Sequence, residues 1–172
     1  AVRKVLDDRS ALSDKRRVLL IVEDDDVFAS LLRDLSRDMK FQSLVAGTAE
    51  EAMSLAIQYL PSAIILDIGL PDGTDDRLYL YHLKHQLPQV IDSFTPDFVF
   101  YQAGVDILQT DLLGRLKISR DGCAERDRFV LQLCKNYGIP VVITMGGGYS
   151  KNVRDIVESH ANTYRFCQQI FF

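Results

Sequence analysis

Three acidic side chains stand directly after two apolar segments of the sequence. Glu23 and Asp24 follow the segment Val18 to Val22, and Asp67 follows the segment Ala63 to Leu66. Both segments are short and continuously apolar, which is typical of strands that are buried on both faces. Because ligands of parallel sheets bind beyond the carboxyl ends of the strands, we expect the three carboxylates to lie at one edge. Like charges repel at that distance, so Mg²⁺ is the predicted occupant, and a carboxylate beside it can attack phosphorus.

The residues around these carboxylates resemble a signalling family. Val22-Glu-Asp-Asp25 and Leu66-Asp-Ile-Gly-Leu-Pro-Asp-Gly73 resemble the receiver domains of bacterial response regulators, over about residues 17–73. The resemblance implies two-component phosphorelay signalling in the cytoplasm, with Asp67 phosphorylated by a histidine kinase or a phosphotransfer protein. The Mg²⁺ ligands that it implies are Glu23, Asp24, Asp67 and the backbone carbonyl of Gly69.

The residues with which receivers read the phosphoryl group are missing from the expected places. Receivers carry Ser or Thr after the fourth strand and Lys-Pro after the fifth, whereas this chain has Gln102 to Gly104 and Thr144 to Gly146 there. Impaired output is therefore expected. Gly147 and Gly148, before the last predicted helix, could present backbone N–H groups to an anion or could simply form a tight turn.

The second half of the sequence resembles the carboxyl-terminal part of the histone deacetylase and acetoin-utilisation family, over about residues 75–165. The resemblance implies that Asp111 corresponds to a zinc ligand and Tyr149 to the tyrosine that stabilises the oxyanion formed when water attacks an amide. A zinc site needs three protein ligands and an open position, and the family's Asp-x-His pair and tandem histidines have no counterpart. Zn²⁺ and deacetylase catalysis are therefore not expected. The matching segments are Pro96–Asp106, Asp111–Leu116, Gly138–Val142, Gly146–Tyr149 and His160–Thr163.

Strands and helices are predicted to alternate along the chain, which indicates parallel βαβ units. We expect one doubly wound α/β domain of three layers, with a single five-stranded parallel sheet in the flavodoxin-like order 2-1-3-4-5. A capping box at Thr48 and Glu51 predicts the start of a helix. Residues 1–16 are predicted to be a leader or linker. Residues 17–168 would form the domain, from a receiver-like half (17–73) and a deacetylase-like half (74–168) joined as in a chimera.

Composition narrows the function classes. The net charge of −4 gives no nucleic-acid footprint, and no apolar segment approaches the roughly 18 residues of a membrane span. The three cysteines lack CxxC spacing, which favours reduced thiols. Three functions stay open: a receiver-like phospho-acceptor with impaired output, an incomplete zinc-dependent hydrolase that uses Asp111 and Tyr149, and an inactive recombinant scaffold. The scaffold could self-associate through its apolar helix faces and the tail 170–172.

Overall fold

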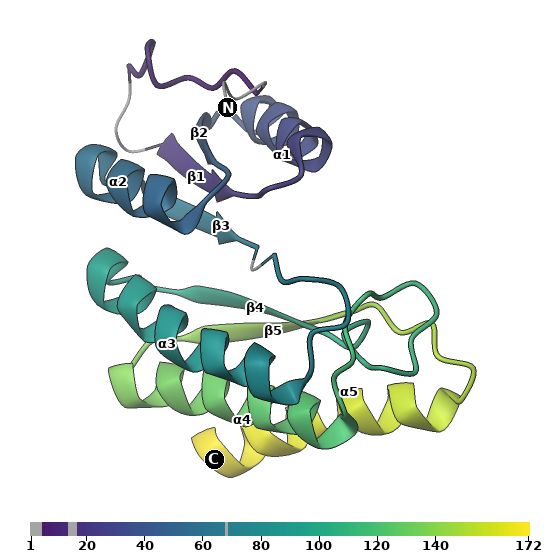
Figure 1. The fold of residues 1–172 in the computed structure, drawn as a ribbon. Coiled ribbons are helices and arrows are strands. Elements are labelled where there is room, and N and C mark those ends of the chain that lie inside the picture. The colour runs from purple at the N-terminus through teal and green to yellow at the C-terminus, as the bar shows by residue number, and fades with distance from the viewer. Residues whose placement is uncertain (1–4, 14–16, 68) are drawn as a thin grey trace. The chain divides into compact units, whose positions relative to one another are not determined.

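The computed structural model describes residues 5–13, 17–67 and 69–172 (Figure 1). The chain divides into two compact units, Ala1–Gly69 and Leu70–Phe172. Among the described residues, no helix combines the length and the apolar character that crossing a membrane requires.

The first unit is built on a three-stranded parallel sheet with the order β2-β1-β3. Its central strand β1 is buried at all five positions, as the continuous apolar sequence predicts. Residues on both faces of β1 therefore form core: Leu20 packs toward α2, and Ile21 packs toward α1. The elements are β1 (Val18–Val22), α1 (Asp26–Asp38), β2 (Gln42–Ala46), α2 (Ala49–Tyr59) and β3 (Ala63–Leu66).

Side-chain caps begin both helices of this unit. The Asp25 carboxylate accepts hydrogen bonds from the backbone of Val27 and Phe28 at the start of α1. The predicted capping box opens α2, because the Thr48 hydroxyl accepts from the backbone N–H of Glu51 at 3.2 Å. Each cap satisfies N–H groups that have no partner within the helix.

Part of the predicted leader lies along the outer edge of β2. The backbone N–H of Asp8 donates to the carbonyl of Ser43, and the Asp8 carboxylate accepts from the Ser43 N–H at 2.8 Å. The Asp7 carboxylate accepts from the next outward N–H of the strand, that of Val45. These contacts satisfy polar groups that an edge strand otherwise leaves open. Residues 1–4 and 14–16 of the leader lie outside the described residues.

The second unit pairs two parallel strands and packs three helices together. Helix α4 packs against both α3 and α5, and Figure 1 shows α4 and α5 below the strand pair. The elements are α3 (Asp76–Phe94), β4 (Val99–Gly104), α4 (Arg120–Tyr137), β5 (Val141–Gly146) and α5 (Val153–Phe171). A long loop, residues 105–119, follows β4, and Val105, Leu108 and Ile118 anchor it in a buried cluster with Cys123.

All five predicted strands form, and every pairing is parallel, so the α/β class is confirmed. The single flavodoxin-like sheet is not found. Among the described residues, β3 pairs with β1 and β4 pairs with β5, in two separate sheets. Strand β3 has only four residues, and Ile65 and Leu66 at its end are exposed. A strand of four residues has few backbone N–H and C=O groups with which to form a ladder.

Candidate functional site

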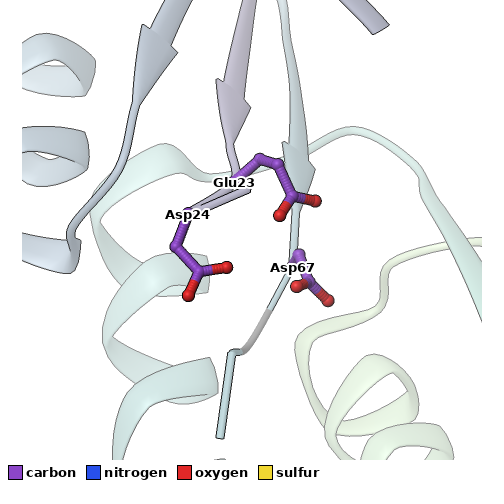
Figure 2. Close-up of side chains that lie close together, drawn as sticks. All are labelled: Glu23, Asp24 and Asp67. Atoms are coloured by element: carbon purple, nitrogen blue, oxygen red, sulfur yellow. The ribbon is translucent and has the colours of Figure 1, made fainter. Parts of the chain in front are cut away.

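The three carboxylates predicted from the strand ends do come together in the first unit. One carboxylate oxygen from each of Glu23, Asp24 and Asp67 lies within 4.8 Å of the others. Figure 2 shows Glu23 and Asp24 leaving β1 and Asp67 leaving β3, with the three side chains gathered at one edge of the sheet. Gly69 lies beside them, since a Cβ there would stand 3.1 Å from Oδ2 of Asp24. The parallel pairing of β1 with β3 produces this convergence.

Glu23 is the buried member of the group, with 6% of its surface exposed. Burial raises the pKa of its carboxyl group, the hydrogen bond from the Asp25 backbone lowers it, and the charges of Asp67 and Asp24 raise it further. The net direction is upward. Ionised Glu23 therefore lowers the free energy of unfolding.

A second carboxylate site lies in the loops of the second unit. Oδ1 of Asp111 accepts from the backbone N–H groups of Leu113 at 2.9 Å and Gly114 at 2.8 Å. Its Oδ2 accepts from the backbone N–H of Tyr149 at 2.6 Å. Burial acts to raise the pKa of Asp111, but these three hydrogen bonds outweigh it and hold the pKa below its ordinary value. A fixed, ionised carboxylate thus lies next to Tyr149, whose side chain is exposed.

Glycines allow the chain to pack closely around Asp106 in these loops. A Cβ on Gly114 would stand 1.8 Å from the carbonyl oxygen of Asp106, and one on Gly147 would stand 2.7 Å from its side chain. Gly147 and Gly148 also have positive φ values of 63° and 107°. Helix α5 begins only at Val153, so the two glycines precede its amino terminus by several residues. The structure gives them a steric role in this turn.

The hydrogen bonds described for the histidines do not involve Asp111. Nδ1 of His85 bonds the carbonyl of Tyr81, and Nδ1 of His82 bonds Gln86, so both rings bond within α3. His160 is buried in α5. Among the described residues, the one group of three potential metal-ligating side chains is Glu23, Asp24 and Asp67. Asp111 does not belong to such a group.

Comparison with known proteins identifies the family. A family model for the histone deacetylase domain matches residues 46–164. The chain belongs to the histone deacetylase domain family. Membership confirms the resemblance of the second half, and the match also extends upstream through β3 and Asp67.

Two sequence relatives show how much of the family's length this chain contains. An uncharacterised protein of Picosynechococcus is 42% identical over 106 residues, which are 62% of this chain and 35% of the relative. Histone deacetylase 2 of Arabidopsis thaliana is 42% identical over 99 residues, which are 57% of this chain and 26% of the relative. The chain thus spans about a third or less of these curated relatives.

Solved structures support the same fold over most of the chain. The histone deacetylase domain of HDA15 aligns with a TM-score of 0.53 at 20% identity, over 89% of this chain and 46% of that one. An acetylpolyamine aminohydrolase from Burkholderia pseudomallei aligns with a TM-score of 0.55 at 14% identity, over 90% of this chain and 46% of that one. At these identities the likeness shows the fold alone.

The receiver interpretation is wrong. The family match includes the segment around Asp67, and the structural alignments cover about nine tenths of the chain. The predicted phosphorelay function and the role of Asp67 as phospho-acceptor depended on that interpretation and are wrong as well. The prediction of a kinase partner had the same single basis. Acidic residues after two neighbouring strands of a parallel sheet arise from topology alone, so the motif was less specific than it appeared.

The metal prediction is corrected as well. Mg²⁺ was expected and Zn²⁺ was not, but the family is one of zinc-dependent hydrolases. The converging carboxylates of the first unit remain a geometric fact without support for Mg²⁺. The absence of the Asp-x-His ligands shows that the zinc site of this chain is incomplete. It does not show which metal the family uses.

Sequence reasoning missed a buried ion pair in α4, Arg126 with Asp127. The side chains are 5% and 0% exposed. A signal was present, because Asp127 falls between Cys123 and Val130 at helical spacing, within the apolar stripe that faces the core. A charged residue in such a stripe is almost never fully buried unless it is paired.

Proposed function

We propose that this chain supplies part of the active site of a zinc-dependent hydrolase that removes acetyl groups from acetylated amines. The observation that carries the proposal is the Asp111 carboxylate, fixed by three backbone N–H groups, one of them that of Tyr149. Similar proteins are named histone deacetylase and acetylpolyamine aminohydrolase. An acetylated lysine or polyamine is therefore the proposed substrate class.

Asp111 suits a metal ligand electrostatically. Its backbone hydrogen bonds favour the ionised form, and zinc binds deprotonated carboxylates. The N–H groups also orient the carboxylate, as the outer contacts of metal ligands commonly do. Among the described residues, no group of three potential metal ligands includes Asp111, so they do not form a complete zinc site. The chain spans only part of its relatives, and the remaining ligands are assigned to the part of the family domain that it does not contain.

Tyr149 is the proposed partner of the substrate. Its backbone is tied to Asp111, while its side chain is 58% exposed. A phenol held in this way can donate a hydrogen bond to the oxygen of an amide carbonyl as negative charge develops there, which is the stabilisation that acyl-transfer sites require. In this arrangement Asp111 would bind the zinc ion. Tyr149, in the neighbouring loop, would stabilise the oxyanion.

The test measures zinc binding and acetate release by the chain combined with the portion of a relative's deacetylase domain that this chain does not contain, which would supply the remaining ligands. We expect Zn²⁺ affinity to fall at least about tenfold in Asp111→Asn, because a charged ligand is lost, and to remain unchanged in the matched control Asp97→Asn, an exposed aspartate elsewhere in the unit. We also expect zinc-dependent release of acetate from an acetyl-lysine peptide or N-acetylputrescine, with Tyr149→Phe slowing it by about 10²-fold. A folded, zinc-loaded combination that releases no acetate, or an Asp111→Asn variant of it with unchanged zinc affinity, would overturn the proposal.

A further inference from the structure

The loop that carries Asp111 leaves β4 at Gly104, where an arginine holds the chain. Nη1 of Arg126, in α4, donates to the carbonyl oxygen of Gly104 at 2.6 Å. This carbonyl is at the last residue of the strand, and Asp106 follows two residues later. The bond therefore fixes the point from which the loop departs.

Arg126 is itself held by Asp127. Its Nε and Nη2 atoms both lie 2.8 Å from Oδ1 of Asp127. The remaining partners of Asp127 come from two other elements, since the Tyr101 hydroxyl of β4 donates to Oδ1 at 2.5 Å and the Thr163 hydroxyl of α5 donates to Oδ2 at 2.6 Å. Burial raises the pKa of Tyr101 well above its usual value, which keeps its hydroxyl a donor. The pair thus ties β4, α4 and α5 to one another.

Stability alone does not account for this arrangement. The desolvation cost of a fully buried ion pair roughly cancels its attraction, and well-packed apolar residues of similar volume often serve as well or better. What an apolar pair cannot do is hold the Gly104 carbonyl and accept hydrogen bonds from Tyr101 and Thr163. The ion pair instead provides directional hydrogen bonds that fix the backbone at Gly104.

The loop transmits position because it is tightly packed. The Asp106 backbone is in such close contact with Gly114 that no Cβ fits between them. Gly114 in turn donates its N–H to Asp111 at 2.8 Å. Because Asp106 and Gly114 are closely packed, a displacement of Gly104 should displace Asp111 as well.

We propose that Arg126 and Asp127 are positioning residues that fix Gly104 and, through the Asp106–Gly114 segment, set where the Asp111 carboxylate lies. The inference rests on the proposed function only in so far as Asp111 is the zinc ligand. The positioning itself is a property of the metal-free chain.

The test compares variants by amide hydrogen exchange of the metal-free protein. In the double variant Arg126→Met with Asp127→Leu, the Gly104 carbonyl and the Tyr101 and Thr163 hydroxyls lose these partners, so the melting temperature should fall. We expect exchange to become at least about tenfold faster at the N–H groups of Gly114 and Tyr149, and less so at the other amides of the second unit. Arg126→Lys keeps the charge but lacks the planar fork that reaches both Gly104 and Asp127, so it should also loosen the loop. The control Arg128→Met, an exposed arginine of the same helix, should leave exchange unchanged.

The outcomes separate this inference from the proposed function. Unchanged loop exchange in a folded double variant overturns it, whether or not the chain binds zinc. If the double variant does not fold, Arg126→Lys decides, because wild-type exchange in that variant would show that charge alone suffices. Faster exchange spread evenly over the second unit would indicate general destabilisation and would likewise count against positioning.

Discussion

In the first unit, three carboxylates gather where two strands end, and burial and mutual repulsion raise the pKa of Glu23. In the second unit, a single carboxylate, Asp111, collects three backbone N–H donors from two loops, and its pKa is lowered. The difference teaches that the pairing of parallel strands can bring like charges together at a cost, which is visible in the raised pKa of Glu23. Loop closure around a carboxylate both satisfies and fixes it. The second arrangement is the one on which the proposed function rests.

The largest expected effect contrasts a glycine from each site. In Gly114→Ala the new Cβ would lie 1.8 Å from a backbone oxygen, whereas in Gly69→Ala it would lie 3.1 Å from the movable end of the Asp24 side chain. We expect Gly114→Ala to cost more than about 3 kcal/mol of unfolding free energy and Gly69→Ala less than about 1 kcal/mol. Urea unfolding of the two variants measures this, and equal losses would contradict the tight packing of the second site.

A smaller effect is expected from neutralising one carboxylate in each unit. Asp111→Asn replaces one acceptor oxygen by an amide that faces N–H donors, and should cost about 1–3 kcal/mol. Asp24→Asn removes one of three neighbouring charges and should cost nothing. Thermal unfolding followed by far-ultraviolet circular dichroism reports on both units, because each contains helices and strands. A loss for Asp24→Asn as large as that for Asp111→Asn would break the comparison.

The smallest effect should come from Glu23→Gln, and its sign should be stabilising. Since the pKa of Glu23 is raised above the ordinary 4.5 in the folded chain, folding disfavours the ionised form, and the penalty is fully present above the raised pKa. We expect a gain of about 1 kcal/mol or less at pH 7. The gain should shrink as the pH falls through the raised pKa toward 4.5. A variant less stable than wild type at pH 7 would show that the Glu23 carboxylate is compensated.

Local sequence signals predicted the elements well. The five strands formed in the predicted order, and the helix that the Thr48 capping box predicted begins there. These features depend on neighbouring residues, so a single sequence contains them. The convergence of Glu23 with Asp67 was also predictable, because the parallel pairing of β1 and β3 follows from the βαβ rhythm.

The family assignment of the first half was not predictable by the same means. Acidic residues after neighbouring strands suit several chemistries, and the motif around Asp67 indicated the wrong one. The prediction of a single five-stranded sheet was wrong for a related reason. Pairing β3 with β4 depends on how two distant edges match, and strand propensity does not contain that information.

The sequence by itself determined the strands, the helices, their caps and the resemblance that marked Asp111 and Tyr149, because each depends on residues close together in the chain. Only the tertiary structure decided that the Tyr149 N–H reaches Asp111 and that Arg126 reaches the carbonyl of Gly104. Those contacts join segments more than twenty residues apart. Their existence depends on loop closure and packing, whose free energies are set by the whole fold and not by any local pattern.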